Sequence, residues 1–142
     1  MTPMASRRPP RRLRLLIVED EALVAFAMEA HLEVAGHEVV GTADTFADAL
    51  RLAEETRPDL VLLDIQLAEG TSGLDVAHAL HARGIACLFS TGNCPGLARE
   101  DAVGCLHKPF GHRQLVEAVA AADAVARGER PARVPNEMHL YR

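Results

Sequence analysis

The sequence predicts an α/β fold, a doubly wound five-stranded parallel sheet with helices on both faces. Short apolar runs alternate five times with segments whose apolar residues recur every three or four positions. This alternation is typical of strands and helices in parallel sheets. Most of the runs are continuously apolar, as expected for strands buried on both faces. Right-handed crossovers leave few other topologies.

The first half of the chain supplies three strands and two helices. Apolar runs predict strands at residues 13–18, 38–42 and 60–63. Helical spacing between them predicts helices at residues 23–30 and 46–53. Gly36 suits the end of the first helix, because glycine readily takes the left-handed conformation found there. Pro58 stops the second helix, because proline cannot continue one.

The second half repeats the pattern. It predicts a helix around residues 76–80, a strand at 85–89, a weak helix near 97–101, a strand at 103–106 and a final helix at 112–126. We therefore expect one domain, residues 13–126, between two tails. Residues 1–12 contain RRPPRR, which cannot bury anything and is expected to be disordered. Residues 127–142 form a short C-terminal tail.

Composition excludes several classes of protein. The net charge of −5 argues against a general nucleic-acid binder, although the first residues are basic. No apolar run is long enough to span a membrane, and we expect a cytoplasmic protein. The three cysteines, Cys87, Cys94 and Cys105, have no zinc-site spacing and are expected to be reduced. The seven histidines form no evident metal cluster, and we expect them to be solvated.

Polar residues follow four of the predicted strands, where parallel strands present their carboxyl ends to one crevice. These residues are Glu19 and Asp20, Asp64, Ser90 and Thr91, and Lys108, the only lysine of the chain. Three carboxylates repel one another, and a hard cation such as Mg²⁺ resolves the repulsion. One carboxylate could also take up a phosphoryl group, whose charged oxygens a lysine and a hydroxyl would stabilise.

Together these motifs resemble the receiver domain of two-component response regulators over roughly residues 13–126. The resemblance implies a flavodoxin-like sheet with strand order 2-1-3-4-5. It implies that Asp64 is the phosphoacceptor, that Thr91 meets the phosphoryl oxygens, and that Lys108 pairs with Asp64 and precedes a cis proline. Mg²⁺ would be held by Glu19, Asp20, Asp64 and the backbone carbonyl of Gln66. A sensor histidine kinase would be the phosphoryl donor.

The sequence is similar to the stand-alone FATGUY-type subgroup, named for a Phe-Ala-Thr-Gly-aromatic motif. Residues 89–92 read FSTG, and Asn93 replaces the aromatic residue. Cys105 stands three residues before the lysine, where many receivers have Tyr or Phe, so the usual threonine–aromatic switch is not expected. The resemblance implies signalling through the fourth helix, fifth strand and fifth helix, in a monomer or weak homodimer.

The function expected from these residues is that of a single-domain response regulator. It would signal by protein contact or act as a phosphate sink, with no enzymatic role beyond self-catalysed phosphorylation and dephosphorylation. The downstream partner is not indicated. The alternative is a phosphorylation-independent pseudo-receiver that binds partners. A phosphohydrolase of the haloacid dehalogenase type is disfavoured, because Asp64-Ile65-Gln66 lacks the second acid of Asp-x-Asp.

Overall fold

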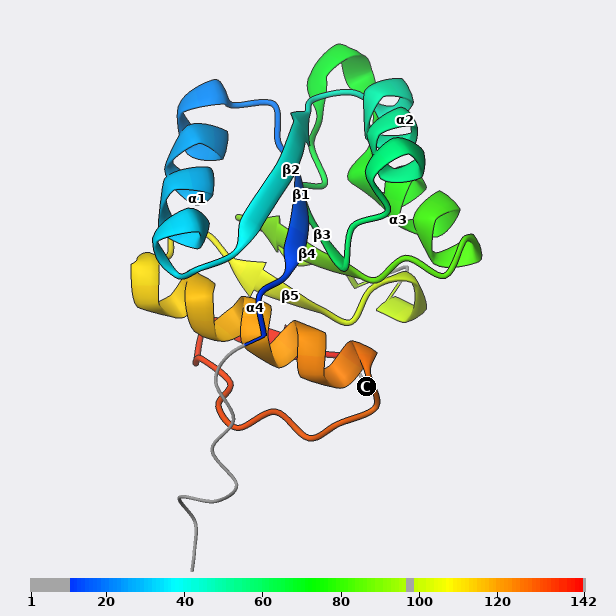
Figure 1. The fold of residues 1–142 in the computed structure, drawn as a ribbon. Coiled ribbons are helices and arrows are strands. Elements are labelled where there is room, and N and C mark those ends of the chain that lie inside the picture. The colour runs from blue at the N-terminus through cyan, green and yellow to red at the C-terminus, as the bar shows by residue number, and fades with distance from the viewer. Residues whose placement is uncertain (1–10, 97–98, 142) are drawn as a thin grey trace, which may run out of the picture.

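The computed structural model of the chain describes residues 11–96 and 99–141. Its strands are β1 (Arg14–Val18), β2 (Glu38–Ala43), β3 (Leu60–Leu63), β4 (Cys87–Thr91), β5 (Gly104–His107) and β6 (Met138–Leu140). Its α-helices are α1 (Ala22–Val34), α2 (Phe46–Thr56), α3 (Gly73–Ala82) and α4 (His112–Ala126). Two 3₁₀ turns are η2 (Ala68–Gly70) and η3 (Arg99–Asp101). Figure 1 shows their arrangement.

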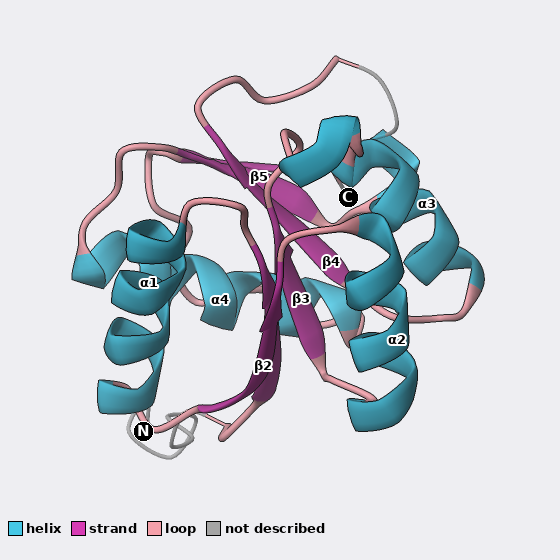
Figure 2. Cartoon of the chain, turned by 90° about the horizontal axis from the view of Figure 1, so that it is seen from above, coloured by secondary structure: helices cyan, strands magenta, loops and turns pink. Residues whose placement is uncertain are grey.

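One sheet runs through the molecule in the order β2-β1-β3-β4-β5-β6. The first five strands are parallel, which confirms the predicted fold class and strand order. Helices α1 and α4 cover one face of the sheet, and α2 and α3 cover the other (Figure 2). Successive β1 residues therefore enter different cores: Leu15 and Ile17 pack on one face, Leu16 and Val18 on the other.

The sixth strand was not predicted. β6 pairs antiparallel with β5 at the edge of the sheet, and further backbone bonds join Tyr141 to Val103 and His107 to Glu137. Gly104 makes this approach possible, because a Cβ there would lie 2.5 Å from the carbonyl oxygen of His139. Only three residues of the C-terminal segment pair, too few for a periodic signal in the sequence.

The weak helix predicted near residues 97–101 is reduced to η3 in the part of the chain that the structure describes. Residues 97 and 98 lie outside the described residues. Pro95 and Gly96 precede the turn, and both residue types disfavour helix. Helix α4 of the structure is therefore the predicted final helix, with the predicted bounds. Among the described residues, the signalling surface implied by the resemblance therefore has η3 in place of the fourth helix, and β6 lies along its fifth strand.

The N-terminal segment is anchored at its last basic residues. Arg11 Nη1 lies 3.2 Å from Asp123 Oδ1 on α4, and Arg127 Nη2 lies 3.0 Å from the other oxygen of this buried carboxylate. Residues 1–10 of the predicted disordered tail lie outside the described residues. Arg11 itself contacts the domain.

His37 differs from the solvated histidines that we expected. Its side chain is buried between α1 and β2, and its Nδ1 accepts a hydrogen bond from the backbone N–H of Leu13 at 3.1 Å. Burial lowers the pKa of His37, and the nearby charge of Asp123 offsets part of this effect. The neutral ring thus supports the start of β1.

We expect the free energy of unfolding to fall as the pH drops below 6.5, the ordinary pKa of histidine. Just below pH 6.5, His37 is protonated in the unfolded chain but stays neutral in the folded chain, so acid favours unfolding. The loss would be about 1.4 kcal/mol for each unit by which the pKa is lowered. The variant His37→Asn, which keeps an acceptor but does not titrate, should show a flatter profile.

Urea unfolding of both proteins between neutral and mildly acidic pH measures this difference. Other groups, including the buried Glu19, titrate in both proteins and cancel in the comparison. Parallel profiles for the two proteins would contradict the assignment.

Candidate functional site

The carboxyl ends of the parallel strands bring the predicted residues to one edge of the sheet. Backbone bonds link the strand ends in turn: Glu19 N–H donates to Ala43 at 2.9 Å, Asp64 N–H to Val18 at 2.9 Å, and Lys108 N–H to Thr91 at 2.9 Å. Each predicted side chain is therefore placed by the sheet itself. The Lys108-Pro109 peptide bond is cis, as the resemblance implied.

Lys108 joins two of the predicted carboxylates. Its Nζ lies 2.6 Å from Glu19 Oε1 and 3.0 Å from Asp64 Oδ2. Both acidic side chains are almost fully buried, while the lysine side chain is 20 % exposed. This arrangement explains why a lysine stands here: one compact ammonium reaches two carboxylates that arrive from different strands.

Burial and pairing act against each other in this ion cluster. Burial lowers the pKa of Lys108, but its hydrogen bonds to Glu19 and Asp64 outweigh burial and raise the pKa above the ordinary value. Burial raises the pKa of Glu19, and the ammonium of Lys108 only partly reverses this. Lys108 thus remains charged, and its ammonium favours the ionised form of the buried Glu19.

A second group of oxygens extends the cluster toward solvent. Carboxylate oxygens of Glu19, Asp20 and Glu21 lie within 4.8 Å of one another, and the last two residues are exposed. Glu21 is not among the metal ligands that the sequence predicts, and in the structure it is the residue that precedes the first turn of α1. Its backbone carbonyl does accept from Ala25 in α1, but its carboxylate also joins the acidic group. Hard oxygen donors in this number suit a divalent cation.

The turn after β3 is closely packed against the start of α3. Gln66 N–H donates to Asp64 Oδ1 at 3.3 Å, which orients the carboxylate. Gly73 N–H donates to the carbonyl of Ile65 at 2.6 Å. A Cβ on Gly73 would lie 1.9 Å from the carbonyl oxygen of Asp64, so only glycine fits. The sequence analysis did not identify Gly73, because no local sequence pattern indicates that its backbone comes this close to that of Asp64.

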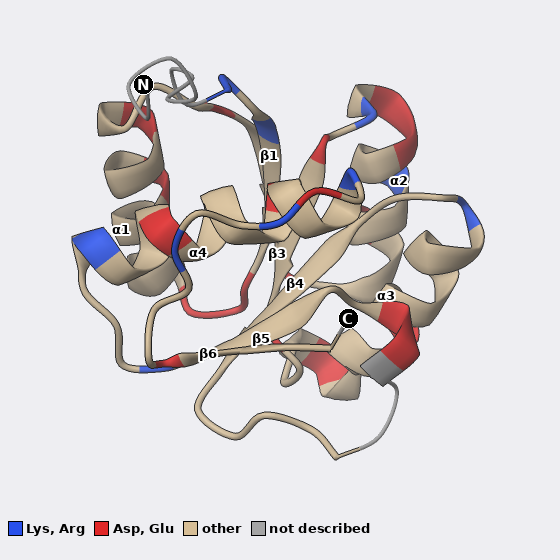
Figure 3. Cartoon of the chain, turned by 90° about the horizontal axis from the view of Figure 1, so that it is seen from below, with Lys and Arg blue, Asp and Glu red and all other residues tan. Residues whose placement is uncertain are grey.

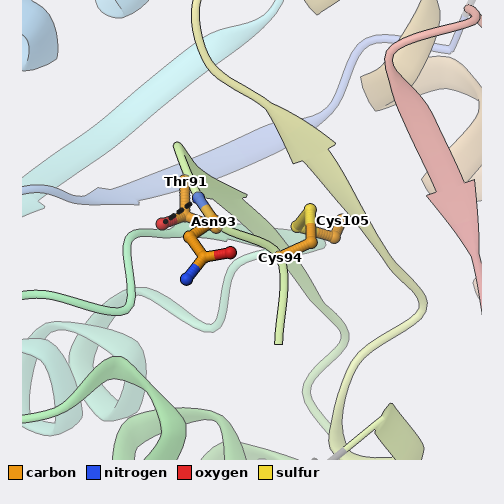
Figure 4. Close-up of a disulfide and its surroundings, with 4 residues drawn as sticks. All are labelled: Thr91, Asn93, Cys94 and Cys105. Atoms are coloured by element: carbon orange, nitrogen blue, oxygen red, sulfur yellow. Dashed lines mark hydrogen bonds between the residues drawn. A yellow bond between two sulfur atoms is a disulfide. The ribbon is translucent and has the colours of Figure 1, made fainter. Parts of the chain in front are cut away.

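The two hydroxyls at the end of β4 differ in their surroundings. Ser90 Oγ is buried and has no hydrogen-bond partner among the described residues. Thr91 Oγ1 accepts from the N–H of Asn93 at 3.5 Å, so it lies toward the following loop (Figure 4). The role predicted for Thr91 stays a prediction, consistent with this direction.

The expectation of three reduced cysteines is wrong for two of them. Cys94 and Cys105 form a disulfide, and Cys87 is free and buried (Figure 4). The loop after β4 turns back across β5, which brings the two Cα atoms to 6.0 Å. Sequence separation alone does not show such a return, because it depends on pairing between β4 and β5.

Acidic and basic residues are interspersed in the described part of the chain, whose full sequence has a net charge of −5. In the view of Figure 3, the basic residues of the described chain are scattered among acidic ones over several elements. Among the described residues, no helix combines the length and apolarity needed to cross a bilayer.

A family model described as the response regulator receiver domain matches residues 15–120. The phyllosphere-induced regulator PhyR of Methylorubrum extorquens is 51% identical over 67 residues, which cover 46% of this chain and 25% of that protein. The transcriptional regulatory protein PdtaR of Mycobacterium tuberculosis is 35% identical over 115 residues, or 77% and 56% of the two chains. The chain thus spans from a quarter to just over half of these relatives.

Solved structures show the same fold. The response regulator PhyR from Brucella abortus superposes with a TM-score of 0.72 at 34% identity, over 84% of this chain and 51% of that chain. The signal receiver domain of a modulated diguanylate cyclase from Desulfovibrio desulfuricans G20 gives a TM-score of 0.73 at 28% identity, over 82% and 98% of the two chains.

Proposed function

Because this chain belongs to the family of response regulator receiver domains, we propose that it accepts a phosphoryl group on Asp64 from a phosphohistidine of a sensor histidine kinase. Receiver domains are signalling modules that take phosphoryl groups from such kinases. The observation that carries the assignment is the 3.0 Å contact between Asp64 Oδ2 and Lys108 Nζ, at a carboxylate that ends a central strand.

The chemistry follows from this contact. An Asp64 oxygen would attack phosphorus while the bond from phosphorus to the donor imidazole nitrogen breaks, and the freed imidazole takes a proton. Negative charge lies on the outer phosphoryl oxygens during the transfer. The ammonium of Lys108 stands beside the attacking carboxylate and would stabilise this charge, and the hydroxyl of Thr91 would donate to another oxygen.

Mg²⁺ fits the donor set of this site. Glu19, Asp20, Asp64 and the backbone carbonyl of Gln66 would hold it, and the exposed Glu21 carboxylate lies within 4.8 Å of those of Glu19 and Asp20. When bound, the ion would neutralise charge on the acids and on the phosphoryl oxygens. Among the described residues, Lys108 is the only cation in contact with these carboxylates, and it pairs with Glu19 and Asp64.

The surface beside the site suits a docking protein. An acid-lined cleft of about 340 Å³ runs from Glu19 and Asp20 along α1 to the start of α2. Phe26 lines it on α1, and Leu23 lies three residues earlier on the same helix. The two large apolar residues are 63% and 86% exposed. We propose that the kinase covers this apolar patch when it presents its phosphohistidine to Asp64.

The phosphorylated chain would act by contact with a downstream protein, or drain phosphoryl groups from the kinase. Phosphorylation adds negative charge where Lys108 already balances two carboxylates. The backbone of Lys108 is hydrogen-bonded to Thr91, so a change at Asp64 reaches both the loop after β4 and the end of β5. These two segments form the proposed output surface.

Intact-mass spectrometry after incubation with Mg²⁺ and acetyl phosphate tests the proposal. The wild-type chain should gain one phosphoryl group, and Asp64→Asn should gain none, because an amide is a poor nucleophile. Chelation of the metal should prevent the gain in the wild type. Asp75→Asn, a change at an exposed carboxyl on α3, is the matched control and should behave as the wild type.

If the wild type gains no phosphoryl group, calorimetric titration with Mg²⁺ decides between the remaining readings. Loss of both metal binding and phosphoryl uptake would overturn the proposal and favour the phosphorylation-independent binding module.

A further inference from the structure

The disulfide between Cys94 and Cys105 joins the two segments that carry the outer groups of the site. Cys94 lies three residues after Thr91, in the loop that follows β4, and Cys105 lies in β5, three residues before Lys108. Figure 4 shows the bond next to Thr91 and Asn93. The two cysteines have a sequence separation of 11, and η3 lies between them.

The crosslink limits the movement of the loop after β4. At one end of the loop, Thr91 is held in β4 opposite His107. Three residues later, Cys94 is bonded to β5, so the exposed residues Gly92 and Asn93 span two fixed points. The disulfide therefore opposes any movement of the Thr91 hydroxyl that is transmitted along this loop. Without the bond, the loop would be held only by weaker contacts.

The two bonded cysteines differ in exposure. Cys105 is fully buried, whereas Cys94 is partly exposed in a loop beside exposed residues, although it also packs against the core. Attack by an external thiolate is therefore expected at Cys94 rather than at Cys105. Disulfides with an accessible sulfur are the exchangeable ones in proteins. The third cysteine takes no part, because burial raises the pKa of Cys87 to about 12 and leaves it unreactive.

We propose that Cys94–Cys105 is a thiol-exchange site, open to dithiol reductants, whose state determines whether the loop after β4 can respond to phosphorylation of Asp64. The bond is thus a second input, located where many receivers have an aromatic residue. The thiol-exchange part stands on the disulfide alone, and the coupling to Asp64 rests on the proposed function.

The thiol exchange is a two-electron reduction of the Cys94–Cys105 disulfide. A thiolate of the dithiol attacks Cys94 Sγ, the Cys94–Cys105 bond breaks, and Cys105 leaves as a thiolate that takes a proton. The second thiol of the reductant then attacks the reductant's other sulfur, which is bonded to Cys94 in the mixed disulfide. This step releases Cys94 as a thiol and leaves the reductant as a disulfide. Hydrogen peroxide would reverse the change, oxidising both thiols and forming two waters.

The first experiment treats the folded full-length chain with dithiothreitol, then alkylates it and determines the mass. We expect one alkyl group, on the partly exposed Cys94, with the buried Cys105 and Cys87 unmodified until the chain is unfolded. Alkylation of the chain without reductant should add none. If the bond resists millimolar dithiothreitol until the chain unfolds, it is a permanent structural crosslink and the proposal is wrong.

The second experiment follows amide hydrogen exchange of residues 92–96 and 99–103 in both redox states. Reduction should speed exchange there by about tenfold or more, because local opening is no longer restrained. Cys94→Ser should exchange like the reduced chain whether or not reductant is present. Equal exchange in the oxidised and reduced chains would overturn the proposal.

The third experiment adds Mg²⁺ and beryllofluoride, a stable mimic of the aspartyl phosphoryl group. The mimic should change exchange in these same residues at least several-fold more in the reduced chain than in the oxidised one. Equal responses in the two states would contradict the coupling. If the mimic binds neither state, the proposed function of Asp64 is wrong, and the first two experiments still judge thiol exchange.

Discussion

Gly73→Ala is expected to lower the free energy of unfolding by about 3 kcal/mol, the upper end of the usual range for overpacking. The new Cβ would lie 1.9 Å from the carbonyl oxygen of Asp64 and 2.7 Å from the Cα of Ile65. Both are backbone atoms, so no side-chain rotation relieves the clash. Either α3 or the turn after β3 must move, and the higher helix propensity of alanine offsets only about 1 kcal/mol of this.

The displacement should also reach the chemistry. The turn that would move carries the Gln66 N–H, which donates to Asp64 Oδ1. We expect slower phosphoryl uptake by Gly73→Ala even at temperatures where the variant remains folded. Thermal unfolding should show a decrease of roughly 10 °C in Tm for a domain of this size, and intact mass against time gives the uptake rate.

Gly96→Ala is the matched control. Gly96 is exposed, and a Cβ there meets nothing within 4 Å. Its stability should stay within about 0.5 kcal/mol of the wild type, as for other surface changes. A Gly73→Ala protein as stable as this control would show that α3 does not pack against the Asp64 turn as described.

Lys108→Met is expected to lower the free energy of unfolding by about 2 kcal/mol at neutral pH. Removing one partner of a buried ion pair typically costs about 3–5 kcal/mol, and the partial exposure of Lys108 reduces this figure. The variant leaves the buried Glu19 and Asp64 carboxylates without the ammonium that lies 2.6 Å and 3.0 Å from them. Methionine keeps much of the length of the side chain, so the loss is chiefly electrostatic.

The pH dependence distinguishes this loss of charge from a packing defect. Burial already raises the pKa of Glu19 above its ordinary 4.5, and the pKa would rise further without Lys108. A group with a raised folded pKa loses stabilisation as the pH increases through that value. The deficit of Lys108→Met should therefore be fully present at neutral pH and shrink as the pH falls toward 4.5.

Urea unfolding over this pH range measures the deficit. Lys108→Arg keeps the charge and should retain most of the stability, although its wider guanidinium changes the contact with Asp64. A deficit that is equal at all pH values, or absent at neutral pH, would contradict the electrostatic account.

Much of the fold could be predicted because its causes are local. Strand β3 has the predicted bounds, 60–63, and α4 the predicted bounds, 112–126. Continuous apolar runs can be buried only in a sheet covered on both faces, and helical spacing indicates which elements cover it. The same order places Glu19, Asp64 and Lys108 at one edge of the sheet.

Other features arise from contacts between segments distant in sequence, which no local pattern specifies. β6 forms because residues 138–140 meet an edge strand whose Gly104 leaves room for them. Of the helix expected near residues 97–101, the described part is the short turn η3, in the loop whose Cys94 is bonded to β5.

The side chains that stand at the strand ends follow from the order of the strands, since parallel strands present their carboxyl ends to one edge. The division of the Lys108 charge between Glu19 and Asp64, and the bond between Cys94 and Cys105, became evident only in the folded chain. Alternation and spacing govern burial along one element. Charge sharing and crosslinking depend on distances of a few ångströms between different elements, which the packing of the whole sheet sets.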